Sequence, residues 1–193
     1  MFRYLLLFLI SFSFAANDGW EIFSNFKENA SIVSNYDLTN YDDKNQSYDH
    51  QKGLFYYDSK YGSKWETKNP YIQTIWISHK ELVVYDQALN QVTKQNFAKL
   101  DFDSPARLLS TDIETLQKKY NLKFESNRLI FEPKSESDLF KRVEIVFHNN
   151  QLEKITIVDK IDYKCVMTLN MLNKKPKPSD FQIKYPKDVE IIE

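Results

Sequence analysis

Apolar residues recur at helical spacing near the start of the chain. Trp20, Phe23, Phe26 and Ala30 follow one another at intervals of three and four, which places them on one face of a helix. The charged residues of the segment, Lys27 among them, fall outside that stripe. The pattern predicts one amphipathic helix whose apolar face packs on the rest of the fold.

After this helix the pattern changes to alternation of apolar and polar positions, which is typical of strands with one covered face. The clearest case is 161–171, where Ile161, Tyr163, Cys165, Met167, Leu169 and Met171 alternate with mostly polar residues. Val143, Ile145 and Phe147 alternate in the same way, and Asn149-Asn150 supplies a turn before the chain returns from Leu152 to Val158. Strands are predicted over residues 31–40, 53–59, 63–68, 71–78, 81–86, 91–97, 122–126, 128–132, 143–148, 152–158 and 161–171, with an edge strand over 189–192. The body is therefore a meander of many antiparallel strands.

Two short helices interrupt the strands. Ser104 followed by Pro105 is a capping residue with proline at the first helical position. Thr111 and Glu114 have the spacing of a capping box, which starts a second helix running to about Tyr120. Helices of one or two turns are unstable alone, so their apolar residues must pack on the sheet. Those residues are Leu108, Leu109, Ile113 and Leu116.

The first fifteen residues have the form of a secretory signal. Arg3 precedes an apolar run from Leu5 to Phe14, and the small residues at Ala15-Ala16 suit cleavage after Ala15. The run is too short to span a bilayer, which takes roughly 20 apolar residues. We therefore expect residues 1–15 to be removed and residues 16–193 to form a single exported domain, which we expect to be a monomer.

Charge and cysteine content narrow the possible partners. The formal net charge is −1, too small to attract nucleic acid or an anionic membrane. Cys165 is the only cysteine, and it lies far from the cleavage site, so the sequence offers neither a lipid anchor there nor an internal disulfide. Because it alternates onto an apolar face, we interpret it as an inert lining residue.

No pattern of residues suggests catalysis, a metal or a cofactor. His50, His79 and His148 are far apart and lie in polar stretches, so we interpret them as solvated or hydrogen-bonded imidazoles. The carboxylates are spread along solvent faces without a pairing suited to acid and base catalysis. We expect a protein that binds and does not catalyse.

An ordered series of short motifs extends over nearly the whole mature chain. The motifs are Leu38-Thr39-Asn40, Gly53-Leu54-Phe55, Lys64-Trp65-Glu66, Asn69-Pro70, Tyr85-Asp86, Leu89-Asn90-Gln91-Val92-Thr93, Ser104-Pro105-Ala106-Arg107-Leu108-Leu109, and Phe181 with Tyr185-Pro186-Lys187-Asp188-Val189. No single motif is specific, but in this order and spacing they resemble the LolA family of outer-membrane lipoprotein carriers.

The resemblance implies a mainly β fold with a helical lid: an unclosed antiparallel barrel of about eleven strands, with an N-terminal helix and short helices over an apolar cavity. It implies a periplasmic chaperone that accepts acylated lipoproteins from an inner-membrane ABC transporter and delivers them to an outer-membrane receptor. Hydrocarbon chains need an apolar container in water, since each CH₂ hidden from water is worth about 0.8 kcal/mol. The residues expected to line the cavity and lid are Trp65, Ile75, Ile77, Leu108, Leu109, Val143, Ile145, Phe147, Cys165, Met167 and Leu169.

One departure from the family concerns the contact that holds the lid shut. The family places an arginine between Gly53 and Trp65, whereas this chain has none there. Lys60 is the candidate replacement, although its ammonium lacks the fixed fork of a guanidinium. The altered latch keeps a second hypothesis open, namely a related envelope module that binds or senses another lipid or a protein. A third hypothesis, an exported hydrolase, has only the secretion signal in its favour.

Overall fold

A computed structural model describes residues 19–96, 107–136, 140–149 and 151–192. The predicted signal (residues 1–15) and the predicted helix start at Ser104-Pro105 lie outside these ranges. In the described ranges the helical elements are α1 (Gly19–Asn29), α2 (Arg107–Ser110), α3 (Ile113–Lys119) and the 3₁₀ turn η2 (Pro178–Phe181). The strands are β1 (Ser31–Tyr41), β2 (Ser47–Asp58), β3 (Gly62–Asn69), β4 (Gln73–Ile77), β5 (Glu81–Asp86), β6 (Gln91–Asn96), β7 (Tyr120–Glu125), β8 (Arg128–Pro133), β9 (Phe140–His148), β10 (Gln151–Asp159), β11 (Lys164–Met171) and β12 (Glu190–Ile192).

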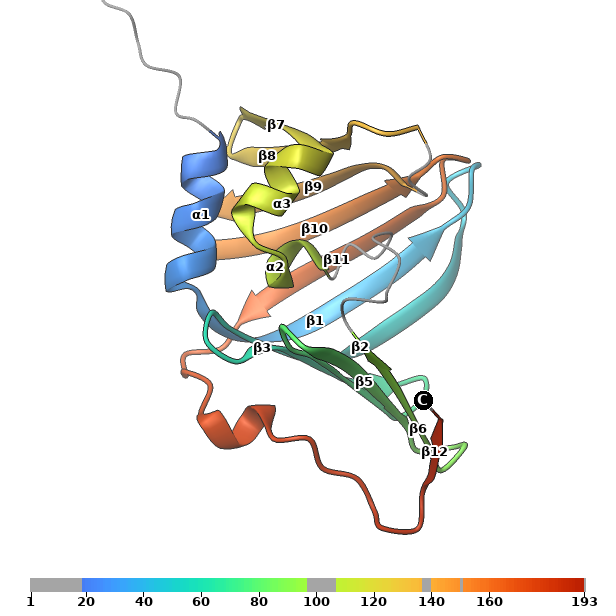
Figure 1. The fold of residues 1–193 in the computed structure, drawn as a ribbon. Coiled ribbons are helices and arrows are strands. Elements are labelled where there is room, and N and C mark those ends of the chain that lie inside the picture. Colours follow the sequence, from blue (N-terminus) through green and yellow to red (C-terminus); the bar gives the residue numbers. More distant parts are fainter. Residues whose placement is uncertain (1–18, 97–106, 137–139, 150, 193) are drawn as a thin grey trace, which may run out of the picture.

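The twelve described strands form one curved sheet in the order β12-β6-β5-β4-β3-β2-β1-β11-β10-β9-β8-β7. Its two edges, β12 and β7, do not pair with each other, so the barrel is unclosed (Figure 1). The predicted unclosed antiparallel barrel of about eleven strands is confirmed. The edge strand predicted at 189–192 is also present, but it pairs with β6 in parallel because the C-terminal segment crosses the sheet before joining it.

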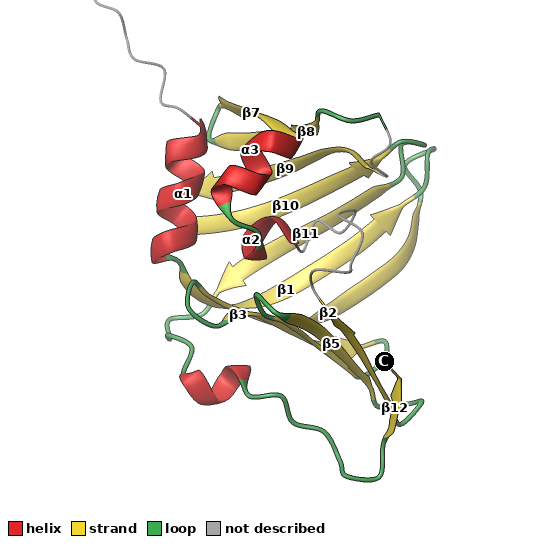
Figure 2. Cartoon of the chain, viewed as in Figure 1, coloured by secondary structure: helices red, strands yellow, loops and turns green. Residues whose placement is uncertain are grey.

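The helices α1, α2 and α3 cover the concave face of the sheet, while the C-terminal segment, which includes η2, lies on the opposite face (Figure 2). Phe23 of α1 is fully buried, and its ring meets Phe131 of β8 edge to face, with 4.8 Å between ring centroids. Phe26 stacks on Tyr57 of β2 at 6.2 Å. Aromatic pairs of this kind add to the burial of apolar area. The predicted stripe of α1 therefore fastens the two halves of the sheet to one helix.

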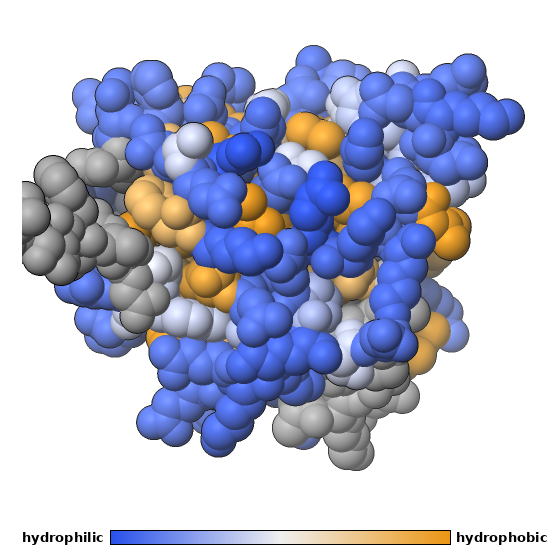
Figure 3. All heavy atoms as spheres, turned by 90° about the horizontal axis from the view of Figure 1, so that it is seen from above, coloured by the Kyte–Doolittle hydropathy of each residue, from blue (hydrophilic) through white to orange (hydrophobic). Residues whose placement is uncertain are grey.

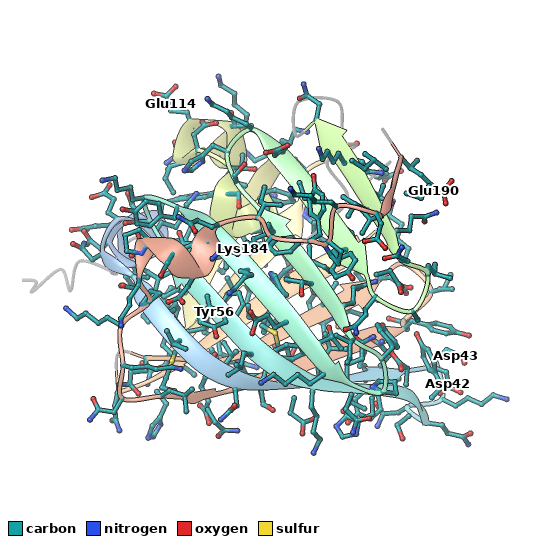
Figure 4. The ribbon with its side chains drawn as sticks, turned by 90° about the horizontal axis from the view of Figure 1, so that it is seen from below. Asp42, Asp43, Tyr56, Glu114, Lys184 and Glu190 are labelled. Atoms are coloured by element: carbon teal, nitrogen blue, oxygen red, sulfur yellow. The ribbon has the colours of Figure 1, made fainter. Side chains whose placement is uncertain are left out.

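The C-terminal segment crosses the convex face beneath β2 to β6, as the view from below shows with Tyr56 and Lys184 on that side (Figure 4). Phe181 stacks on Tyr61 at 5.4 Å. Farther along, Tyr185 and Val189 pack against a small cluster of buried residues on the same face, made of Trp76, Val83 and Val92. This second cluster explains why the outward positions of β4 to β6 are apolar.

Two local predictions are wrong. The strand predicted over 161–171 begins at Lys164, because the Asp159 carboxylate accepts hydrogen bonds from the backbone N–H groups of Ile161 and Tyr163 and folds them into a turn. Ile161 is 67% exposed as a result. The cap of α3 is Asp112 and not Thr111, since the Asp112 carboxylate accepts from the Thr115 N–H at 2.8 Å.

Candidate functional site: a lid over the concave face

The helices α2 and α3, here called the lid, lie over the concave face beside α1 (Figure 1). Leu108 and Leu109 are 3% and 5% exposed, and Leu116 is fully buried. All three belong to the main core cluster, together with inward residues of the sheet. Because α2 has four residues and α3 seven, this packing and not intrinsic helix stability holds the lid in place.

Side chains from three other elements donate hydrogen bonds to three successive carbonyls where α2 ends. The Tyr57 hydroxyl of β2 lies 3.3 Å from the carbonyl oxygen of Leu109. Nδ1 of His79, in the turn between β4 and β5, lies 3.2 Å from that of Ser110. The Lys27 ammonium of α1 donates to the carbonyl of Thr111. Carbonyls at a helix C-terminus lack partners within the helix and carry partial negative charge. We call Lys27, Tyr57 and His79 the latch.

Sequence reasoning missed the latch. It placed Lys27 outside the buried stripe of α1, but Lys27 is half-buried and approaches the lid. Its position four residues after Phe23, on the inner side of the helix, was the available signal. The described contacts of Lys60 are with its neighbours: its N–H donates to Asp58, and its ammonium lies 5.4 Å from the Tyr61 ring centroid. A latching role for Lys60 stays a prediction.

Burial shifts the pKa values of two latch groups. It lowers the pKa of Lys27 from 10.5 to about 8, although Asp112 nearby opposes the shift. It also raises the pKa of Tyr57 to about 12, so this hydroxyl keeps its proton at neutral pH and can donate.

The junction of α2 and α3 holds polar atoms that oppose closure. The hydroxyls of Ser110 and Thr111 are buried without a hydrogen-bond partner among the described residues. Each such group typically costs about 1–3 kcal/mol. Opening the lid would hydrate both hydroxyls, which offsets part of the cost of exposing Leu108 and Leu109.

The structure brings together most of the predicted lining residues. Six of them are buried in the main core cluster: Leu108, Leu109, Val143, Ile145, Met167 and Leu169. Trp65 and Phe147 are half-buried and pack against this cluster. Ile75 and Cys165 lie half-buried elsewhere on the same face of the sheet, and Ile77 is buried outside the cluster.

Three further observations concern the reactivity of the cysteine, metal binding and membrane-spanning helices. Burial, with a smaller contribution from Asp49, raises the pKa of the Cys165 thiol to about 11, so little of the reactive thiolate exists at neutral pH. No group of three or more His, Cys, Asp or Glu side chains within the described ranges is placed to hold a metal ion. In the same ranges no helix has the length and apolar character to cross a membrane.

Gly53, the first residue of one family-like motif, lets an aromatic ring pack closely across its strand. Gly53 pairs with Tyr36 on one side and Thr67 on the other, and the Tyr36 hydroxyl lies 2.6 Å from the Thr67 hydroxyl. A Cβ at position 53 would collide with the Glu66 carbonyl and lie 2.8 Å from the Tyr36 ring. Glycine therefore allows the Tyr36 ring to lie across the strand and meet Trp65, with 5.7 Å between ring centroids.

Comparisons with known proteins agree with this architecture. The family model described as outer membrane lipoprotein carrier protein LolA matches residues 28–184. The outer-membrane lipoprotein carrier protein of Chromobacterium violaceum is 29% identical over 136 residues, which cover 67% of this chain and 66% of that protein. Its namesake in Legionella pneumophila is 30% identical over 135 residues, covering 67% of each chain. The chain thus spans about two thirds of the length of the curated relatives it matches.

A solved structure shares the fold at low sequence identity. The crystal structure of a LolA superfamily protein from Nitrosomonas europaea superposes with a TM-score of 0.52 at 10% identity, covering 86% of this chain and 97% of that one. The family match extends over most of the same elements, from the end of α1 to the segment after η2. The chain therefore belongs to the LolA family of outer membrane lipoprotein carrier proteins.

Proposed function

We propose that the protein is a periplasmic chaperone that takes up the acyl chains of lipoproteins beneath its lid and carries them across the aqueous envelope. The observation that carries the proposal is the lid itself. It buries apolar residues on a concave apolar face, and at one edge it accepts hydrogen bonds from side chains of α1, β2 and the β4–β5 turn. Acyl chains that replaced Leu108 and Leu109 on this face would keep its apolar area out of water.

The proposed cycle requires reversible packing and no covalent chemistry. When the lid lifts, the inward residues of β9 and β11, such as Val143, Ile145 and Met167, become available to hydrocarbon. The three donors of the latch return to water, which offsets part of the cost of breaking their hydrogen bonds. Acylated lipoproteins are the proposed cargo, supplied by an inner-membrane lipoprotein-releasing ABC transporter and given up to an outer-membrane lipoprotein receptor.

The test is release of cargo from membranes. Residues 16–193 are purified and incubated with ATP and inner-membrane vesicles that contain the transporter and a labelled triacylated lipoprotein. We expect the lipoprotein to move from the membrane pellet to the supernatant in a one-to-one complex with the chain. If the label stays in the pellet while an established carrier releases it, the proposal is wrong.

A second experiment distinguishes a lipoprotein carrier from a related module that senses another lipid or a protein. Mass spectrometry of ligands extracted from the protein, purified from the envelope of its own cell, should detect acylated peptides. Recovery of phospholipid alone, or of a protein partner without acyl chains, would favour the second hypothesis.

A further inference from the structure

An open hollow with an apolar floor and a polar rim lies outside the lid, between α1 and the nearby ends of β1, β9, β10 and β11. It has a volume of about 900 Å³, within the range of about 300–1,000 Å³ that is typical of ligand pockets. Among the described residues that line it, none belongs to α2 or α3. We call it the end groove. Of the predicted lining residues only Phe147 reaches it.

The floor of the end groove is apolar and continuous with the core. Phe26 of α1 and Phe147 of β9 meet edge to face there, with 5.1 Å between ring centroids. Leu152 lines the groove and also belongs to the main core cluster beneath the helices. An acyl chain lying on this floor would therefore reach the core without crossing the lid.

The surface of the molecule seen from above is largely hydrophilic, with separate apolar patches (Figure 3).

The rim of the end groove carries amide side chains in place of charges. Its carboxamide residues are Asn25, Asn29, Asn127, Asn149 and Gln151, and Lys174 is the one charged residue in the described lining. Of the five carboxamides, only that of Asn29 forms a described hydrogen bond, to the backbone of Asn25. The other four are exposed and make no hydrogen bond among the described residues.

The composition of this rim indicates what it would bind. A carboxamide offers two donors and an acceptor, which match a peptide amide or an ester carbonyl. Phosphate and carboxylate groups are better held by clusters of arginine and lysine, which the described lining lacks. An apolar floor beneath a rim of amides therefore matches an acyl chain joined to a peptide through an amide bond.

Backbone conformation in turns explains why asparagine occupies two of the rim positions, but it does not explain the carboxamides at the others. Asn127 and Asn149 have φ values of 61° and 49°, a backbone conformation that asparagine tolerates in turns. Asn25 lies on a helix and Gln151 at the start of a strand, where no such requirement applies. Three segments, α1, the β7–β8 turn and the β9–β10 hairpin, thus bring to one opening carboxamides that make no hydrogen bond among the described residues.

We propose that the end groove binds the N-terminal acyl chain of a triacylated lipoprotein, with the rim carboxamides hydrogen-bonded to the amide that joins this chain to the peptide. The inference rests on the proposed carrier function. It assigns the acyl chains of one lipoprotein to two binding places on the protein. The remaining chains lie under the lid, and the N-linked chain lies beside α1. The groove therefore distinguishes cargo with an acylated N-terminus from cargo with a free N-terminal amine.

Two synthetic lipopeptides with the same fluorophore test this inference, one triacylated and one diacylated with a free N-terminal amine. We expect wild-type protein to bind the triacylated probe about tenfold more tightly, the effect of one or two hydrogen bonds and buried apolar contact. The variant Asn127→Gly/Asn149→Gly removes two carboxamides while keeping turns that tolerate positive φ. We expect it to lose most of this preference.

Matched variants complete the experiment. Asn45→Gly changes an asparagine of φ 64° in the turn between β1 and β2, away from the end groove, and should keep the full preference. Ala30→Phe should fill the groove and abolish the preference, and urea unfolding will verify that each variant is folded. A photo-crosslinking residue at Gln151 should capture the triacylated probe, and one at Gln46 should not.

The outcomes separate the two proposals. If wild-type protein binds both probes equally, or if the rim and filling variants keep the preference, the end groove is not the site of the N-linked chain, but the carrier function stands. If wild-type protein binds neither probe, both proposals fail.

Discussion

The ammonium group of Lys27 on α1 donates a hydrogen bond to the carbonyl of Thr111, 84 residues away, where α2 meets α3. One lysine thus connects the N-terminal helix to the lid. Hydrogen bonds to charged groups typically contribute about 1.5–3 kcal/mol, so this single contact bears on whether the lid stays closed.

Lys27→Met keeps the length and apolar stem of the side chain but removes the donor. We expect faster amide hydrogen exchange across residues 107–116, with protection reduced by about 1–2 kcal/mol, because the Thr111 carbonyl loses its partner. Lys60→Met is the matched control and should leave exchange in the lid unchanged. The opposite result, with protection lost only in Lys60→Met, would assign the latch to Lys60.

The latch should also make stability depend on pH. Below about pH 8 the Lys27 side chain is protonated in both the folded and the unfolded protein. Between about pH 8 and 10.5 it keeps its proton in the unfolded protein but has released it in the folded protein. The free energy of unfolding contributed by this group therefore rises with pH across that window. Urea unfolding of wild type and Lys27→Met at several pH values will measure the difference between them. A difference that stays constant from pH 8 to 10.5 would contradict the lowered pKa of Lys27.

Leu109→Glu places a carboxylate on the inner face of the lid. Leu109 is 5% exposed, so we expect the lid to open and binding of a triacylated lipopeptide to fall by at least tenfold, with a smaller change in the unfolding midpoint of the sheet. Leu89→Glu is the control, since Leu89 is 67% exposed in the turn between β5 and β6. Fluorescence titration and urea unfolding are the two measurements. Equal affinity of wild type and Leu109→Glu would show that the lid face does not contact cargo.

Gly53→Ala should destabilise the sheet where the Tyr36 ring crosses it. The added methyl group collides with the backbone of Glu66, and we expect a loss of about 1–3 kcal/mol, typical of overpacking. Gly19→Ala should be much milder, because its Cβ meets a flexible Leu122 side chain at 3.2 Å. Thermal unfolding followed by circular dichroism compares the two, and similar midpoints would refute the close-approach explanation.

The sequence predicted helices and strands correctly where the local pattern of apolar and polar residues determines them. The spacing of Trp20, Phe23 and Phe26 predicted α1 and its buried face, and alternation predicted most of the strands to within about three residues, although β2 begins at Ser47, six residues before the predicted start at 53. It failed at Ile161, where the Asp159 side chain competes for the backbone, and at Thr111, where the neighbouring Asp112 takes the cap. In both cases a polar side chain offered the backbone a local partner that periodicity does not record.

The functional features were harder to read than the fold, because they join distant segments. Lys27, Tyr57 and His79 have nothing in common in sequence, and only the curvature of the sheet brings them to three successive carbonyls. The end groove likewise draws its rim from a helix, two turns and a strand.

The amino-acid sequence by itself determined a β-rich chain with an amphipathic helix and the ordered motifs of its family, since local periodicity encodes the elements and the residues themselves carry the motifs; export stays a prediction from the first fifteen residues. Tertiary structure alone decided which side chains contact the lid carbonyls, where the last strand pairs and where the end groove opens. The physical reason is that a hydrogen bond such as Lys27 to Thr111 depends on a position in space, which many other residues must first establish.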